Sequence, residues 1–76
     1  METKKKEDRK LLGSQIEDRI LEYIKEKPLE VGDRLPNEFE LAEMFEVGRS
    51  TIREAVKGLV TKGVLQVRRG AGTYVS

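Results

Sequence analysis

The sequence lacks the two residue types that most often carry chemistry in small proteins. Its 76 residues include no cysteine, so neither a disulfide nor a thiolate-bound metal supports the fold. They also include no histidine, which removes the commonest general base and the commonest zinc ligand. Paired carboxylates such as Glu38 and Glu40 fall on helix faces expected to be wet, without a pocket. We therefore expect no catalytic residue, no metal site and no cofactor.

Long apolar runs are absent as well. No stretch approaches the roughly 18 apolar residues of a membrane span, and none resembles a secretory signal. We therefore expect no membrane contact and a cytoplasmic location. A length of 76 residues corresponds to one small domain.

The net charge of +1 conceals an uneven distribution of charged residues. Residues 47–76 carry six basic residues against one acidic residue, whereas residues 7–46 carry twelve acidic against six basic residues. A basic third on a nearly neutral chain indicates an anionic partner. Charge alone leaves a second interpretation open, in which these side chains form an ordinary solvated surface.

The chain divides into a charged arm, residues 1–12, and a domain, residues 13–76. The arm, METKKKEDRKLL, has no apolar period, so we predict it to be disordered. Two roles stay open for it: a tail that improves solubility, or a basic arm that contacts phosphates.

Apolar spacing predicts two helices in the acidic part of the domain. The first covers SQIEDRILEYIKEK, where Ser14 and Glu17 form a capping-box pattern and isoleucines recur every four residues. Pro28 ends this helix, because proline disfavours the helical conformation of the residue before it. The second covers NEFELAEMFE and begins with the capping-box pattern of Asn37 and Glu40.

A third helix, residues 49–62, follows a break at Val47 and Gly48, where glycine permits a tight turn. Its apolar residues recur at helical spacing and predict a buried face; they are Ile52, Ala55, Val56, Leu59 and Val60. Gly63 is the expected C-terminal stop.

The end of the chain reads as a β-hairpin. Leu65 and Val67 alternate with polar residues, RRGAG forms a glycine-bearing turn, and Tyr74 and Val75 begin the return strand. The complete order predicts a mostly α (α+β) fold, a three-helix winged helix-turn-helix with a C-terminal two-stranded β-hairpin as the wing.

The exposed strip of the third helix carries Arg49, Ser50, Arg53 and Lys57. An α-helix fits the major groove of B-DNA, where arginine forms a bidentate contact with guanine, and the second helix of this motif enters the groove. An ordinary ion-paired surface is the alternative for the two arginines. Arg49 has no acid three or four positions later, and Glu54 points away from Arg53, so we favour DNA contact.

For Ser50 and Thr51 two roles stay open, either helix capping and phosphate contact or simple solvation. In the hairpin turn, residues 68–72, the pair Arg68 and Arg69 beside Gly70 favours phosphate or minor-groove contact. The alternative there is a tight turn with two solvated charges.

The stretch GDRLPNEFELAEMFEVGRSTIREAVKGLVTKGVLQVRRGAGTYV resembles the winged-helix DNA-binding domain of the GntR family of bacterial transcription regulators, nearest the FadR-type branch. The resemblance implies that Arg49 and Arg53 contact operator bases or phosphates, and that Ser50 and Thr51 contact the backbone. It also implies that Arg69 and Gly70 form the wing tip in the minor groove.

Two positions depart from the family pattern. Gly48 stands where the family commonly has serine or threonine, which removes an N-cap hydroxyl. Phe39 stands where arginine is often found, and it is either a core residue or an exposed surface for another contact.

The resemblance implies a transcription regulator, for instance a repressor, that binds double-stranded DNA at a palindromic operator, as a dimer on DNA and as a monomer or weak dimer alone. A small-molecule effector would act only through a C-terminal domain that this chain does not include. The alternative function is a winged-helix protein–protein interaction module, because fold does not fix function.

Overall fold

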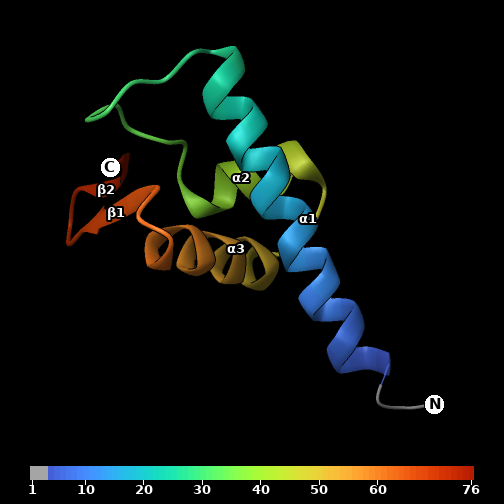
Figure 1. Ribbon diagram of the computed structural model, residues 1–76. Helices are drawn as coiled ribbons and strands as arrows, with labels where there is room; N and C mark the ends of the chain where they lie inside the picture. Colours follow the sequence, from blue (N-terminus) through green and yellow to red (C-terminus); the bar gives the residue numbers. More distant parts are fainter. Residues whose placement is uncertain (1–3) are drawn as a thin grey trace.

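Three helices precede a β-hairpin, as the sequence predicts. In the computed structural model, which describes residues 4–76, the elements are α1 (Lys4–Glu26), α2 (Glu38–Phe45), α3 (Arg49–Thr61), β1 (Leu65–Arg68) and β2 (Gly72–Val75) (Figure 1). The two strands pair antiparallel, with Leu65 opposite Val75 and Arg68 opposite Gly72. The predicted winged helix-turn-helix fold is therefore confirmed. None of the helices described in residues 4–76 has the length and apolar character needed to cross a membrane.

The first helix is longer than the sequence indicates. Because α1 begins at Lys4, Ser14 lies inside the helix and the expected capping box of Ser14 and Glu17 does not form. Residues 4–12 are helical, so the expectation of disorder is wrong for them; residues 1–3 lie outside the described residues. The physical reason is propensity, since lysine, arginine, glutamate and leucine dominate this segment and all favour helix.

One apolar core joins all five elements. Its buried side chains are Ile16, Ile20, Leu35, Leu41, Ala42, Phe45, Ile52, Ala55, Leu59, Leu65 and Val75. α3 contributes a narrower face than predicted, because Val60 is 37% exposed and Val56 is half-buried. These two valines lie at the side of α3 that faces the hairpin, beyond the surface covered by α1 and α2.

The connector between α1 and α2 holds the base of the hairpin. Arg34 forms an isolated antiparallel bridge with Tyr74. The Leu35 N–H donates to the Thr73 carbonyl at 2.8 Å, and the Val75 N–H donates to the Asp33 carbonyl at 2.9 Å. β2 therefore lies between β1 and the connector, and the hairpin cannot pivot freely on α3.

A close approach between α1 and α3 depends on Gly58. A side chain at this position would collide with the Glu17 carboxylate, which accepts a hydrogen bond from Lys62 Nζ at 2.6 Å. This hydrogen bond, together with the charge of Glu17, raises the pKa of Lys62.

In the turn between α2 and α3, the residue with an unusual backbone conformation is Glu46. Glu46 adopts the left-handed region with φ 57° and ψ 47°, and its N–H donates to the carbonyls of Ala42 and Glu43. Gly48, where the sequence suggested a permissive break, has an ordinary extended backbone with φ −73°. The left-handed conformation costs a residue with a side chain about 1–2 kcal/mol.

We therefore expect Glu46→Gly to increase the free energy of unfolding by about 0.5–1 kcal/mol, because glycine adopts this conformation without strain. Glu43→Gly, in the interior of the same helix, should instead lower it by about 1 kcal/mol. Urea unfolding followed by circular dichroism measures both. Glu46→Gln separates backbone strain from removal of the acid at the helix end; equal stabilisation by Gln and Gly would show that strain at Glu46 is not the cause.

Candidate nucleic-acid interface

The exposed face of α3 carries the side chains that the sequence assigned to DNA contact. Arg49, Ser50, Arg53 and Lys57 are exposed, and Thr51 is half-buried. The opposite face of the helix is buried in the core. Folding therefore presents this set of polar and basic groups on one surface.

α3 begins without a side-chain cap, as its glycine N-cap predicts. Gly48 has no side chain that could cap the helix. Its backbone carbonyl accepts hydrogen bonds from the N–H groups of Thr51 and Ile52 at 3.2 and 3.3 Å. Within the described part of the chain, the N–H groups of Arg49 and Ser50 have no hydrogen-bond acceptor. Such groups at the positive end of a helix dipole suit a phosphate.

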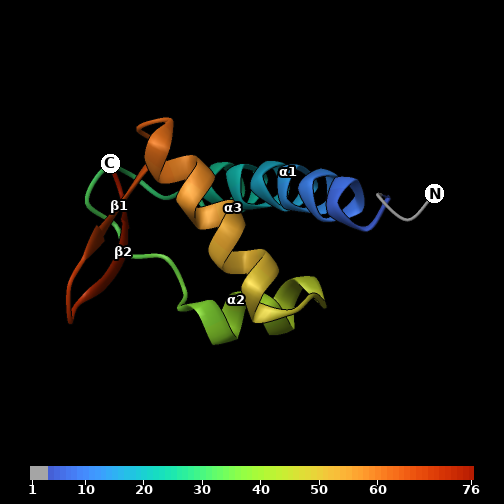
Figure 2. The same ribbon diagram turned by 90° about the horizontal axis from the view of Figure 1, so that it is seen from below.

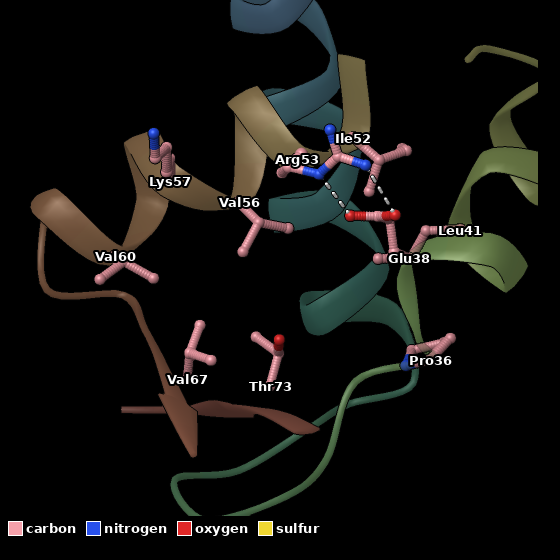
Figure 3. A pocket seen from close by; sticks show the side chains of 10 residues that line it. All are labelled: Pro36, Glu38, Leu41, Ile52, Arg53, Val56, Lys57, Val60, Val67 and Thr73. Atoms are coloured by element: carbon pink, nitrogen blue, oxygen red, sulfur yellow. Dashed lines mark hydrogen bonds and ion pairs between the residues drawn. The ribbon is translucent and has the colours of Figure 1, made fainter. Parts of the chain in front are cut away.

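Arg53 is not free, which corrects the sequence-based expectation. Its Nε donates to Glu38 Oε2 at 2.9 Å, and its Nη2 donates to Glu38 Oε1 at 3.2 Å (Figure 3). The expectation of an unpaired Arg53 considered acids of the same helix only. The pairing joins the first residue of α2 to α3, a contact that only tertiary packing produces.

Glu38 is positioned by the start of its own helix. The Asn37 side chain accepts from the Glu40 N–H, and the Glu40 side chain accepts from the Asn37 N–H, both at 2.8 Å. This confirms the predicted capping box of α2 and fixes the first turn, in which Glu38 is the leading residue. The hydrogen bond from Arg53 to Glu38, and then their charge attraction, raise the pKa of Arg53.

The Arg49 side chain, unlike that of Arg53, has no carboxylate partner in residues 12–76. None of the hydrogen bonds or ion pairs in residues 12–76 involves the Arg49 guanidinium. One arginine of the surface is thus held in a fixed orientation by a carboxylate, whereas the other is available to move.

An apolar groove of about 310 Å³ separates α3 from the hairpin. Its lining residues are Pro36, Glu38, Leu41, Ile52, Arg53, Val56, Lys57, Val60, Val67 and Thr73 (Figure 3). Val56 and Val60 of α3 lie opposite Val67 of β1, while Arg53 and Lys57 add positive charge from α3. The groove therefore combines an apolar surface with nearby cations.

The hairpin turn presents two further arginines. Arg68 lies over the ring of Tyr74, with 4.8 Å from its Cζ to the ring centroid, and the Tyr74 hydroxyl donates to the Ala71 carbonyl at 3.2 Å. Arg69 and Gly70 are exposed at the tip, and Gly70 has φ 74°, which glycine accepts readily. Tyr74 thus stiffens the turn that carries the arginines.

The sequence missed Glu38 and Tyr74 as parts of this surface. Glu38 read as one more acid on a wet helix face, and Tyr74 as a strand residue. No local pattern reveals either role, because both depend on contacts with residues distant in the chain or across the hairpin. Phe39, for which the sequence allows either a core or a surface position, is 58% exposed and does not belong to the core.

The fold and this surface together define a winged helix-turn-helix domain: α2 and α3 are joined by a tight turn, and a hairpin follows α3. Residues 12–75 match the family described as "Bacterial regulatory proteins, gntR family". The chain belongs to this family, which confirms the resemblance seen in the sequence.

Similar proteins include two from Escherichia coli that are named as operon regulators. The chain is 45% identical over 64 residues to the putative L-lactate dehydrogenase operon regulatory protein of Escherichia coli K12, covering 84% of this chain and 25% of that protein. It is 47% identical over 64 residues to the Uxu operon transcriptional regulator of the same organism, covering 84% and 23%. These relatives fit the FadR-type branch. The chain thus spans about a quarter of their length.

Solved structures of similar fold include one named Streptococcus agalactiae GntR, with a TM-score of 0.81 and 56% identity over 84% of this chain and 31% of that one. A second is the structure titled AraR(DBD) in complex with operator ORX1, with a TM-score of 0.79 and 34% identity, covering 86% of this chain and 78% of that one.

The pairing of Arg53 with Glu38 predicts a difference in solvent exchange. We expect the Arg53 Nε–H to exchange with water more slowly than the Arg49 Nε–H, since only the former donates to a carboxylate. Glu38→Gln should bring the two rates together, whereas Glu43→Gln, which removes an exposed acid from the same helix, should not. NMR of the arginine Nε–H groups measures these rates; equal rates in the unsubstituted chain would contradict the pairing in solution.

Proposed function

We propose that this chain is the sequence-specific DNA-binding domain of a bacterial transcription regulator, acting in the cytoplasm. α3 lies in the major groove of operator DNA, and the hairpin tip lies at the adjacent minor groove. The observation that carries this proposal is the exposure of arginines on two segments, the start of α3 and the tip of the hairpin, with a groove between α3 and the hairpin.

The start of α3 supplies groups of two kinds. Arg49 and Arg53 have the planar fork that matches guanine O6 and N7 in the major groove. Ser50, Thr51 and the free N–H groups of the first turn contact phosphates and set the depth of the helix in the groove. Glu38 holds the Arg53 guanidinium in one orientation before DNA arrives.

The protein groove between α3 and the hairpin accommodates one sugar–phosphate backbone of the DNA, the one that lies between the major groove and the adjacent minor groove. A sugar–phosphate backbone presents apolar deoxyribose surface between charged phosphates. Val56, Val60 and Val67 offer an apolar surface for the sugars, and Lys57 is placed for a phosphate.

The relatives support the proposal by their names. The AraR domain at 34% identity is described in complex with an operator, and the two Escherichia coli relatives are named as operon regulators. We further propose that two such domains bind the halves of a palindromic operator, and that a small-molecule effector acts through a separate domain. The longer chains of the relatives are compatible with that arrangement.

Loss of either recognition arginine should weaken operator binding. After selection of a preferred site from random duplexes, we expect Arg49→Ala and Arg53→Ala each to lower its affinity roughly tenfold to a hundredfold and to relax the preference at one base pair. Fluorescence anisotropy of labelled duplexes measures the affinity. Lys25→Ala removes an exposed charge from the last turn of α1 and serves as the control. Wild-type affinity in both arginine variants would refute the assignment of α3 and favour a protein partner.

The wing should contribute affinity without base preference. We expect Arg69→Ala to weaken binding to the selected site and to random duplex by the same factor, because a phosphate contact carries no sequence information. The slope of log K against log salt should become shallower by about 0.9. A loss confined to the selected site would instead assign Arg69 to base recognition.

A further inference from the structure

The two faces of the hairpin differ in chemistry. Side chains alternate between the faces along each strand, and the strand register assigns them. The inner face, toward the core and the groove, carries Leu65, Val67, Thr73 and Val75. The outer face carries Gln66, Arg68 and Tyr74, together with Gly72, which has no side chain.

A third arginine reaches this outer face from a distant part of the chain. Arg34 lies in the connector before α2, and its backbone pairs with Tyr74. Its side chain crosses Gly72: a Cβ at Gly72 would lie 2.8 Å from Arg34 Nε and 3.5 Å from its Cζ. Gly72 also has φ 129°, a conformation that side chains rarely adopt. The missing side chain at Gly72 is what allows the guanidinium to lie across the strand.

The Arg34 guanidinium is available to a partner. The residue is exposed, and no hydrogen bond or ion pair found in residues 12–76 engages its side chain. Arg68, on the same face, stacks on Tyr74 and remains exposed. Two guanidinium groups therefore belong to one face of the hairpin, and neither strand contributes an acidic residue to it.

The position of Arg34 matches the edge of a DNA minor groove. Arg68 and Gly72 form the last pair before the turn, residues 69–71. At about 3.3 Å per residue, a turn of this size extends roughly 5–7 Å beyond that pair, and the minor groove is about 7.5 Å deep. A tip inserted into the groove would therefore bring Arg34 level with the phosphates at its edge.

We propose that the outer face of the wing, through Arg34 with Arg68, contacts the phosphates of the DNA strand across the minor groove, while the inner face and α3 hold the nearer strand. This inference rests on the proposed DNA-binding function and adds Arg34 to the interface. The wing then lies between two strands, with one face toward each, and a groove about 6 Å wide makes both contacts reachable.

The test compares three variants of the whole chain on a short random-sequence duplex. We expect Arg34→Gln to lower the affinity severalfold and to make the slope of log K against log salt shallower by about 0.9, the effect of one lost phosphate contact. Arg34→Lys keeps the charge and should keep the slope. Lys25→Gln removes one charge from α1, the helix from which the hairpin points away (Figure 2), and should change neither quantity.

Hydroxyl-radical footprinting on a selected operator then locates the contact. Arg34→Gln should lose protection on the strand across the minor groove and retain it on the strand beside α3. An unchanged slope in Arg34→Gln, with DNA binding that still depends on Arg49 and Arg53, would overturn this inference and leave the proposed function intact. Protection lost beside α3 instead would also overturn it. Absence of salt-dependent DNA binding by the unsubstituted chain would refute both.

Discussion

Burial of one face of α3 against α1 and α2 is the constraint on which the whole interface depends. Ile52, Ala55 and Leu59 are fully buried. Because these three residues fix which face of α3 packs against the core, they also fix which face points to solvent. The basic residues of α3 are exposed because the apolar ones are not. A chain of 76 residues has little core to spare, so the buried residues and the proposed DNA-contact residues share one helix of 13 residues.

The hairpin is tied into the same core, which sets its distance from α3. Leu65 and Val75 form one cross-strand pair and are both buried. The connector adds hydrogen bonds to the free edge of β2 and buries Leu35 beside it. Beyond this anchored end the strands extend into solvent (Figure 2). The tip is thus carried by a rigid base, and binding does not have to order it. No polar or charged residue is buried in residues 12–76, for which burial is described, so the charged groups of this part of the chain remain on the surface.

Local sequence patterns predicted the elements well where a local interaction determines them. The capping box of Asn37 and Glu40, the stop at Pro28 and the hairpin turn each depend on residues a few positions apart, and each was found. The start of α1 was misplaced, since an apolar period says nothing about a charged segment with high helix propensity. The exposed basic strip of α3 follows from its buried stripe. Two contacts do not follow from local patterns: the pairing of Arg53 with Glu38, and the passage of the Arg34 side chain across Gly72. They join residues 15 and 38 positions apart, respectively, through the packing of separate elements.

The pairing of Arg53 with an acid has a consequence for selectivity. A free arginine at a DNA surface gains from any phosphate, whatever the sequence. Glu38 reduces that gain, because its charge repels phosphates and its two hydrogen bonds occupy the guanidinium. A guanine edge can still accept from the remaining N–H groups of the fork, which Glu38 already holds in plane. In the proposed interface, the acid would therefore weaken non-specific contact by Arg53 more than specific contact, whereas Arg49, without such a partner, would contribute to both. On the proposed function, a surface that carries one held and one free arginine would combine general attraction to DNA with discrimination between bases.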